Sequence, residues 1–305
     1  MAGAKNGTFL FQRDFMDYHK DRFEDFSLMV FKKNKLLAVL PLNKKEMEVY
    51  SHAGLTYGGL LLKKEAKLKE VLFCYQHILK YLSEEGIQTL HIKQIPGMYC
   101  SNPSEEIQYA SFVFKALIPR VDVASTIVLF GGLKIQKNRM EGVKKGAKLG
   151  LEVRETSHFE SFWNEILVPN LQKRHGAAPV HSVEEITQLH HNFPNHIKQF
   201  NVHHGEKLVA GATIFEMPHL VHVQYISSND DRQQLGALDF LFHELITQRY
   251  ADKRFFDFGT SNEEQGKKLN EGLLYWKECF GARSMVHSHY QFATENYPLL
   301  DSVFI

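Results

Sequence analysis

The sequence predicts an α+β protein built from two domains. Its 305 residues are long for one domain and fit two domains of about 100–200 residues each. The order strand, strand, helix, strand can be read twice along the chain, once in each half, as in folds that pack helices on sheets. Hydrophobic residues make up 44% of the chain and charged residues 23%, which is typical of a soluble globular enzyme. We expect one domain over residues 1–125 and another over 126–305.

The first half contains a predicted hairpin, helix and strand. Apolar runs at 27–31 and 36–42 flank a basic turn at 32–35, a pattern that indicates a hairpin. Glycines interrupt any regular element at 54–59. Apolar residues then recur at helical spacing from Leu68 to Leu82, and Gly86 follows as a stop. The segment 89–92 alternates like a strand.

The second half repeats this order after a basic segment. Residues 134–149 are predicted to form a basic helix that ends at Gly150. A mainly helical insertion is expected at about 156–200, and strands at 202–205, 207–215 and 220–226. A helix through Leu238 and Ile246, a strand at 255–258 and a last strand at 285–292 complete the pattern.

Composition excludes several classes of protein. The formal net charge of +1 predicts neither a nucleic-acid-binding protein nor a protein of the membrane surface. Three widely spaced cysteines form no disulfide framework and no metal motif. Apolar runs are far too short to span a bilayer, and no signal-peptide pattern is present. We therefore expect a cytoplasmic protein without a membrane span.

The most informative stretch lies near the C-terminus. An aromatic strand, Phe255-Phe256, runs into Asp257-Phe258-Gly259, and a later apolar turn contains Trp276-Lys277 before Phe280-Gly281. An unpaired ammonium is costly to bury, so Lys277 must find a partner or reach water. The alternative interpretation of Lys277 is a solvated lysine beside Glu278. The alternative for Asp257 is a capping role at the end of the strand.

These residues resemble a motif of the tandem GNAT-fold transferases, above all the Fem-type aminoacyltransferases and their acyl-CoA-dependent acetyltransferase relatives. The motif is matched by Asp257-Phe258-Gly259, Gly272-Leu273, Trp276-Lys277 and Phe280-Gly281. The basic segment before Gly150 and the glycine-rich segment 54–59 resemble further parts of the family. The resemblance covers the whole chain and is sharp over residues 254–282. It implies two tandem GNAT-like domains with mixed, mostly antiparallel sheets and an active cleft in the second domain.

The resemblance also implies roles for individual residues. In the GNAT fold, a splayed strand supplies a backbone N–H to the oxyanion, and a helix N-terminus holds the phosphates of the donor. The catalytic candidates are Lys277, Tyr225 and Asp257, and those for binding the donor are Gln224, Ile226, Gln233, Gly236 and Ala237. The expected Arg/Gln-x-x-Gly-x-Gly/Ala loop is matched up to Gly236 and departs at Leu238. An ordinary strand–turn–helix unit is the alternative interpretation.

Acceptor-binding candidates lie elsewhere in the chain. The segment from Lys173 to His181 corresponds to a region that helps Fem-type enzymes to bind the acceptor. There Arg174 could grip a phosphate or carboxylate, and His175 or His181 could deprotonate an amine. Tyr57, within the glycine-rich segment, is a further candidate. A polar loop between helices is the alternative for the segment that ends at His181.

Two features invite other interpretations. The chain has 17 histidines, with pairs at 190–191, 203–204 and 287–289, but none has the spacing of a zinc motif, so we expect no metal. The basic segment 134–148 could contact tRNA, although a solvated helix face is the commoner meaning of such a run.

The sequence thus predicts an N-acyltransferase. It would move an acyl group, with acetyl-CoA or another acyl-CoA as co-substrate, to an amine of a sugar, amino acid or cell-envelope precursor. Two alternatives stay open: transfer from aminoacyl-tRNA to a peptidoglycan precursor, and a degenerate GNAT pair that only binds. The oligomeric state is not predicted.

Overall fold

A computed structural model of the chain describes residues 3–230 and 232–305, without the side chains of residues 174, 175, 232 and 233. Its contacts form two compact units, residues 1–122 with 286–305, and residues 123–285. The chain enters the second unit within strand β8 (Leu117–Val128) and returns within β16 (Arg283–Ala293). The assignment of residues 126–305 to one domain stays a prediction; these contacts group residues 286–305 with the first unit.

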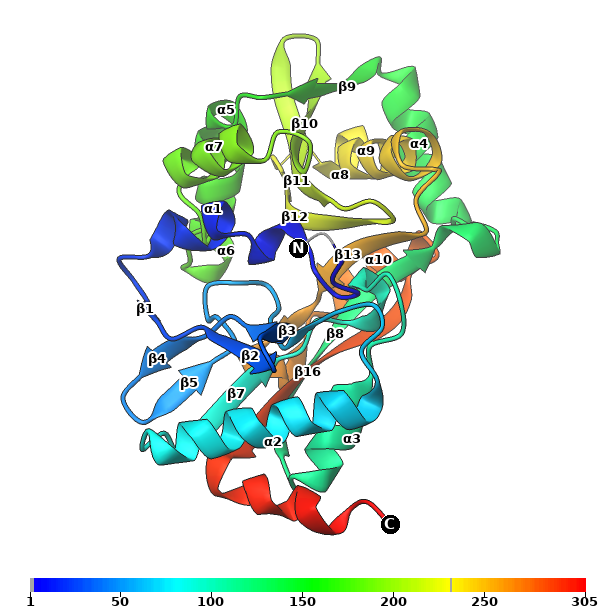
Figure 1. The fold of residues 1–305 in the computed structure, drawn as a ribbon. Helices are drawn as coiled ribbons and strands as arrows, with labels where there is room; N and C mark the ends of the chain where they lie inside the picture. Colours follow the sequence, from blue (N-terminus) through cyan, green and yellow to red (C-terminus); the bar gives the residue numbers. More distant parts are fainter. Residues whose placement is uncertain (1–2, 231) are drawn as a thin grey trace. The chain divides into compact units, whose positions relative to one another are not determined.

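The first unit contains two groups of strands and two longer helices (Figure 1). One group has the order β1-β4-β5-β7-β16, and the other has the order β2-β3-β6. The strands are β1 (Glu24–Asp25), β2 (Leu28–Lys32), β3 (Lys35–Leu40), β4 (Asn43–Lys45), β5 (Glu48–Tyr50), β6 (Leu61–Leu62) and β7 (Thr89–Lys93). The α-helices are α1 (Arg13–Met16), α2 (Leu68–Glu84) and α3 (Glu106–Val113), and short 3₁₀ helices lie at Phe9–Phe11, Asp17–His19, Gly97–Tyr99 and Thr294–Ser302.

Helix α2 forms where the apolar periodicity predicts it. Its buried residues recur at helical spacing and pack on the strands of this unit, so the helix is held by its apolar face. The predicted hairpin is also confirmed: β2 pairs antiparallel with β3, from Leu28 opposite Leu40 to Lys32 opposite Lys35. The left-handed backbone of Lys33 and Asn34 closes its turn.

The second unit is a sheet of six strands with helices on its faces. The strand order is β8-β13-β12-β11-β10-β9. Besides β8, these are β9 (Leu151–Thr156), β10 (Ile197–His204), β11 (Lys207–Glu216), β12 (Leu220–Ser228) and β13 (Phe255–Thr260). All neighbours pair antiparallel except β12 and β13, which pair parallel. A separate pair, β14 (Asn262–Glu263) and β15 (Lys268–Leu269), follows β13.

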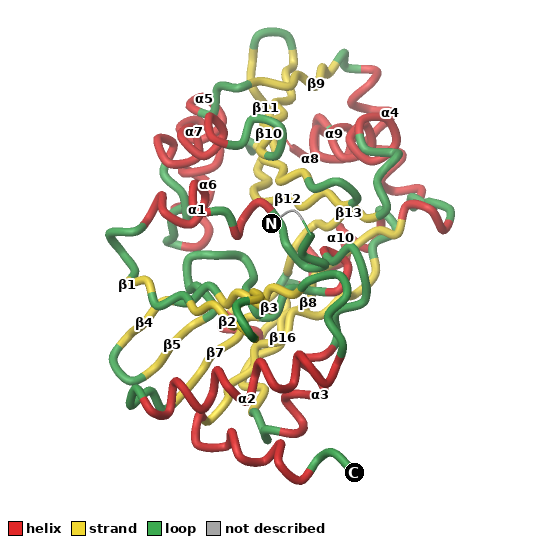
Figure 2. Tube along the Cα trace, viewed as in Figure 1, coloured by secondary structure: helices red, strands yellow, loops and turns green. Residues whose placement is uncertain are grey.

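Seven α-helical segments belong to the second unit among its described residues. They are α4 (Lys137–Lys148), α5 (Glu160–Phe162), α6 (Val168–His175), α7 (Val183–Asn192), α8 (Arg232–Leu235), α9 (Ala237–Glu244) and α10 (Glu271–Cys279). Single π-helical turns at Trp163–Leu167 and Leu245–Arg249 extend α5 and α9, and 3₁₀ turns lie at Leu129–Gly131 and Glu264–Gly266. Helices α4 and α9 lie side by side in both ribbon and tube (Figure 2).

These elements confirm the predicted α+β class and most of the predicted order. The expected helical insertion is present as α5, α6 and α7, and the basic segment is helical as α4. Strands β8 and β9 were not predicted. The alternating residues of β8 include Arg120 and Asp122, charged side chains that obscure the pattern of a strand.

Candidate functional site

The strands β12 and β13 separate in the middle of the second unit. They pair parallel over Leu220–Phe255, Val221–Phe256 and His222–Asp257, and then each continues without pairing to the other. A β-bulge lies at the same level, because Val223 is opposite Ile214 whereas Tyr225 is opposite Thr213, which leaves Gln224 without a residue opposite it on β11. Bulges redirect side chains and end pairing, so the fork is a built feature of the sheet.

A histidine and a carboxylate meet at this fork. The Nδ1 atom of His222 lies 2.8 Å from Oδ2 of Asp257, and Asp257 is fully buried. The other carboxylate oxygen accepts hydrogen bonds from the backbone N–H of Gly259, at 2.9 Å, and the hydroxyl of Thr126, at 3.1 Å. Because the carboxylate accepts at Nδ1, it selects the tautomer in which Nε2 carries a lone pair. The pair is therefore arranged like a general base, His222, whose ring is oriented by a carboxylate, Asp257.

Gly259 makes room for this histidine. Its φ is +69°, a left-handed backbone that glycine adopts at little cost. A Cβ at this position would lie 3.2 Å from Cε1 of His222. The Asp257-Phe258-Gly259 motif thus supplies both the carboxylate and the space that the imidazole needs.

Lys277 is buried beside the same strand end, at 2% exposure. Its ammonium donates to the backbone oxygens of Gly259, at 2.9 Å, and Thr260, at 2.8 Å. Burial lowers the pKa of Lys277 to about 8, and the charge of Asp257 opposes that shift. The alternative of a solvated lysine is therefore wrong. Because Lys277 is bound to main-chain carbonyls, the geometry gives it a part in fixing the end of β13.

Tyr225 and His181 form a second polar pair on the same strand. The Tyr225 hydroxyl accepts from the backbone N–H of His181 at 3.1 Å and lies 2.6 Å from its Nδ1. Burial raises the pKa of Tyr225 to about 12, so the hydroxyl keeps its proton at neutral pH. The rings of His181 and His222 both lie 6.4 Å from the ring of Phe215. The structure therefore brings His181, Tyr225, Asp257 and Lys277 into one region of the second unit.

Of the residues expected to bind the donor, Gln224 and Ile226 lie on β12 at and after the bulge. The side-chain oxygen of Gln224 is buried and has no hydrogen-bond partner among the described residues. Buried polar atoms are nearly always satisfied, so an orphan acceptor at the fork marks a position where a ligand or water can bind. Ile226 packs against the core of this unit. The side chain of Gln233 lies outside the described residues.

Gly236 and Ala237 start helix α9 as expected, but Gly236 lies against helix α4. A Cβ on Gly236 would lie 2.4 Å from the backbone oxygen of Gly142, and Ala237 is fully buried. The φ of +67° at Gly236 adds a second reason for glycine. Helix packing thus accounts for this glycine, and its role in holding phosphates stays a prediction.

A salt bridge locks the same two helices together. Arg139 of α4 donates to Oδ1 of Asp239 on α9 at 2.9 Å, and the indole N–H of Trp276 donates to that oxygen at 2.9 Å. Burial raises the pKa of Asp239, and these two donors act against that rise. Arg139 is therefore occupied within the unit, whereas the lysines of α4, Lys137, Lys144, Lys145 and Lys148, are exposed.

The remaining acceptor-binding candidates are Arg174, His175 and Tyr57. The side chains of Arg174 and His175 lie outside the described residues. Tyr57 belongs to the first unit, where it is 1% exposed and donates to the hydroxyl of Thr8 at 3.0 Å. Its ring packs against Phe11 and Tyr99, as expected of a core residue.

The sequence did not predict His222. Its partner Asp257 is 35 positions away, and only the parallel pairing of β12 with β13 brings them together. The available signal was a histidine inside an apolar strand that ends in the predicted site. A buried polar side chain needs a partner, so a histidine in this strand indicates a polar partner on a neighbouring element.

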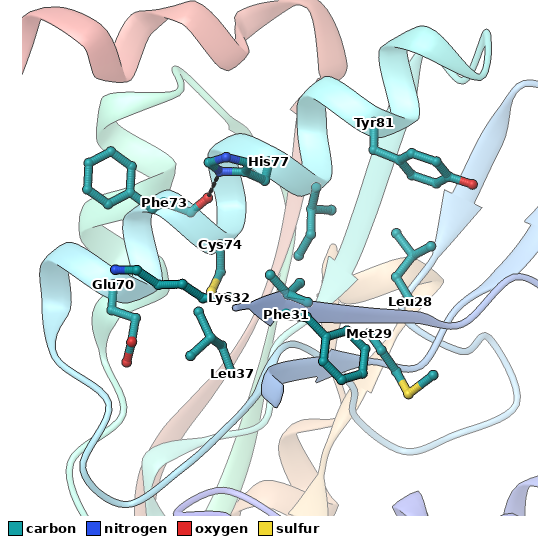
Figure 3. A pocket seen from close by; sticks show the side chains of 12 residues that line it. Leu28, Met29, Phe31, Lys32, Leu37, Glu70, Phe73, Cys74, His77 and Tyr81 are labelled. Carbon is teal, nitrogen blue, oxygen red and sulfur yellow. Dashed lines mark hydrogen bonds between the residues drawn. The ribbon is translucent and has the colours of Figure 1, made fainter. Parts of the chain in front are cut away.

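A cavity of about 660 Å³ lies in the first unit (Figure 3). It is lined by β2 and α2 and is mostly apolar, with Lys32 and Glu70 at one end. None of the predicted site residues lines it. Size alone would favour this cavity as a ligand site, but the hydrogen-bonded pair of His222 and Asp257 lies at the fork of β12 and β13.

The described residues show neither a cluster of metal ligands nor a helix able to span a membrane. The part of the chain that the structure describes holds no group of three or more histidine, cysteine, aspartate or glutamate side chains placed to bind a metal. Within the same residues, no helix combines the length and the apolar character needed to cross a bilayer.

Comparison with solved structures identifies the fold. FemX matches with a TM-score of 0.66 over 97% of this chain and 95% of its own, at 10% sequence identity. The L-PGS structure from Bacillus licheniformis matches with a TM-score of 0.60, at 11% identity, over 90% of this chain and 88% of its own. The C-terminal domain of a putative lysylphosphatidylglycerol synthetase from Agrobacterium fabrum gives 0.59, at 12% identity, over 91% and 87%. No protein-family model matches this chain, and no curated protein does. The chain therefore has the fold shared by FemX and the L-PGS structure.

Proposed function

We propose that the chain is an N-acyltransferase whose reaction takes place at the fork of β12 and β13. The observation that carries the proposal is the hydrogen bond of 2.8 Å between His222 and Asp257 at the point where the strands part. The likeness in fold to FemX and L-PGS supports acyl transfer as the class of reaction. Residues 223 onward of β12 have no strand partner on the β13 side among the described strands, so backbone N–H groups there can serve a ligand.

His222 is the proposed general base. As the nitrogen of the acceptor amine attacks the carbonyl carbon of the acyl donor, its proton passes to Nε2 of His222. Asp257 holds the ring and stabilises the imidazolium that forms. The bond from the carbonyl carbon to the leaving group then breaks. Tyr225, which stays protonated because burial raises its pKa to about 12, is the proposed proton donor to the leaving group.

The proposed donor is an acyl-CoA and the proposed acceptor an amine of a sugar, amino acid or cell-envelope precursor. A pyrophosphate at the start of α9 would lie near Gly236 and Ala237, as the GNAT resemblance implies. The packing of Gly236 on Gly142 favours a second candidate, transfer from aminoacyl-tRNA, because that donor needs no pyrophosphate cradle. In that case, the exposed lysines of α4 would contact the tRNA.

Titration calorimetry with acetyl-CoA, CoA and charged tRNA distinguishes the donors. We expect saturable binding of acetyl-CoA, and no binding of tRNA at physiological salt. If tRNA binds instead, its affinity should fall steeply with salt, by roughly one logarithmic unit per logarithmic unit of salt for each phosphate contact. Binding of neither ligand would leave the degenerate pair as the better interpretation.

The variant His222→Gln tests the chemistry. We expect turnover with the bound donor and a panel of amines to fall about 10²- to 10⁴-fold, the range for loss of a general base. The exposed His158 offers a matched control, and His158→Gln should retain full turnover. Full turnover of a folded His222→Gln protein would remove the base from the mechanism.

A further inference from the structure

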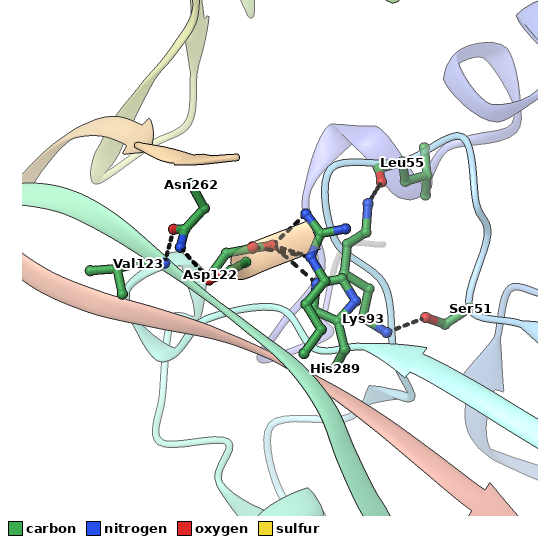
Figure 4. Close-up of polar contacts among 9 residues, drawn as sticks. Ser51, Leu55, Lys93, Asp122, Val123, Asn262 and His289 are labelled. Atoms are coloured by element: carbon green, nitrogen blue, oxygen red, sulfur yellow. Dashed lines mark hydrogen bonds and ion pairs between the residues drawn. The ribbon is translucent and has the colours of Figure 1, made fainter. Parts of the chain in front are cut away.

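Four charged or titratable side chains converge on the sheet of the first unit (Figure 4). Asp122 of β8 accepts from Nε of Arg120 at 3.0 and 2.9 Å, and Nη2 of Arg120 lies 2.8 Å from Oδ2. The Nε2 atom of His289, on β16, lies 3.3 Å from the same oxygen. Lys93 of β7 is opposite His289 in the β-ladder. Arg120 and His289 thus contact one carboxylate from two strands, and Lys93 stands next to His289 on a third.

The glycine-rich segment of the first unit holds Lys93 in place. Nζ of Lys93 donates to the backbone oxygen of Leu55 at 2.7 Å, and its backbone N–H donates to the hydroxyl of Ser51 at 2.9 Å. Gly58 lies so close that an added Cβ would be 2.0 Å from the backbone oxygen of Ser51. The glycine is therefore needed for the loop to reach the lysine.

Positive charge exceeds negative charge in this cluster. Lys93 and Arg120 are opposed by Asp122 alone among the groups that act on Lys93. Burial lowers the pKa of Lys93 to about 8, and the charge of Arg120 lowers it further. Burial also lowers the pKa of His289, followed by the charges of Arg120 and Lys93. An anion placed among these groups would relieve the mutual repulsion of the cations.

We propose that this cluster is a binding site for a tetrahedral oxyanion, the phosphate group of a soluble ligand. The Nε and Nη2 atoms of Arg120 engage Asp122 side-on, which leaves the Nη1 side of the guanidinium to donate to a ligand. The other donors, Lys93 and His289, come from two further strands, so the donors are not coplanar and suit a tetrahedral group better than a planar carboxylate. The side chains of Asp122 and His289 are only 8% and 19% exposed, too recessed for a flat lipid surface, whereas Arg120 is 38% exposed and opens the way to solvent.

Binding at this site should be coupled to protonation of His289. Because Asp122 accepts at Nε2, the neutral ring has its lone pair on Nδ1, and protonation turns that atom into a donor. The charged groups that act on the ring are Lys93 from β7 and Arg120 and Asp122 from β8. A bound anion favours the imidazolium, so the protein should take up protons as it binds. This inference does not depend on the proposed acyl transfer.

Titration of the full chain with sodium sulfate tests the inference, at an ionic strength held constant with sodium chloride. Sulfate is tetrahedral and does not titrate near neutral pH, so any proton taken up enters the protein. We expect saturable binding by calorimetry, with proton uptake revealed by buffers of different ionisation heat. In NMR spectra, the His289 ring, assigned with His289→Gln, should show a pKa raised by saturating sulfate. Acetate at the same concentration should not saturate the site.

Variants locate the site. Lys93→Met should weaken sulfate binding about tenfold or more, the effect of one charge-assisted hydrogen bond. Lys64→Met, at an exposed lysine of the same unit, should bind as the wild type does. No saturable binding, equal affinity in Lys93→Met, acetate binding as tight as sulfate, or a His289 pKa that sulfate leaves unchanged would each overturn the proposal. The last measurement uses the wild-type protein, so it holds even if Lys93→Met does not fold.

Discussion

Three glycines of the second unit share a left-handed backbone and differ in what surrounds them. φ is +59° at Gly205, +69° at Gly259 and +67° at Gly236. An added Cβ would meet nothing within 4 Å at Gly205, would lie 3.2 Å from the His222 ring at Gly259, and would lie 2.4 Å from the backbone oxygen of Gly142 at Gly236. Comparing alanine at the three positions therefore separates two losses of stability: that of a left-handed backbone in a residue with a Cβ, and that of the steric contact made by the Cβ.

The expected losses of stability follow from these distances. A left-handed alanine costs about 1–2 kcal/mol, and reduced freedom of the unfolded chain offsets about 0.4–1 kcal/mol. We expect Gly205→Ala to lower the free energy of unfolding by about 1 kcal/mol. Gly259→Ala should cost somewhat more, because a ring must shift by a few tenths of an ångström. Gly236→Ala should cost about 3 kcal/mol, since overpacking against a backbone atom adds about 1–3 kcal/mol.

Urea unfolding of the three variants measures this order. Circular dichroism and tryptophan fluorescence should give coincident transitions if unfolding is two-state. The order of loss should be Gly236→Ala, then Gly259→Ala, then Gly205→Ala. If Gly236→Ala is as stable as Gly205→Ala, Gly236 is not packed tightly against Gly142. Helix packing would then no longer explain this glycine, and phosphate binding at the start of α9 would become the better explanation.

Three shorter predictions concern charge and reactivity. Asp257→Asn should lower turnover at least about 10²-fold, because the amide no longer selects the base tautomer of His222; steady-state kinetics would show it, and an unchanged kcat would contradict the assigned role. The pKa of Lys277 is about 8 in the folded protein against an ordinary 10.5, so the unfolded chain binds more protons between these values and this residue's contribution makes stability rise with pH. Urea unfolding at pH 7 and 9.5 should show a gain of about 2 kcal/mol that Lys277→Met lacks. Burial raises the thiol pKa of Cys74 to about 11 and of Cys100 to about 12, so both should resist alkylation until the protein unfolds, as mass spectrometry can check.

Local patterns predicted most of the fold because they depend on neighbours in the sequence. The periodicity from Leu68 to Leu82 gives helix α2, and the basic turn after Phe31 gives the hairpin. Strand β8 escaped prediction because its partners are distant in sequence and its charged residues serve a polar cluster. Such a strand is defined by pairing, which no local pattern records.

The site was predicted in part for the same reason. Asp257 and Lys277 stand in a recognisable motif, and Tyr225 lies on the strand that the resemblance implied. His222 becomes a candidate only because β13 pairs beside it. Gly236 shows the opposite difficulty. A glycine before a helix fits both a phosphate cradle and a close helix contact, and the sequence cannot distinguish a ligand from Gly142 as the neighbour.

The lysine of the late motif gives the last test, because its contacts point to a positioning role. Its ammonium binds the carbonyls of Gly259 and Thr260, directly after the carboxylate that holds His222. Lys277→Met removes two hydrogen bonds to main-chain carbonyls, and loss of the buried one, to Gly259, costs about 1–3 kcal/mol. It also removes a desolvated charge whose lowered pKa corresponds to about 3 kcal/mol, so the net change in stability at neutral pH should be small.

Activity should respond differently from stability. Without the ammonium, the negative charge of Asp257 is no longer opposed by Lys277, and the imidazolium of His222 is better stabilised. The acid limb of the pH–rate profile for kcat/KM should therefore move to higher pH. A residue that only fixed the strand end would lower kcat without moving that limb. Lys277→Arg, which keeps the charge, should leave the limb in place, and a limb that is unmoved in Lys277→Met as well would refute the electrostatic part of the argument.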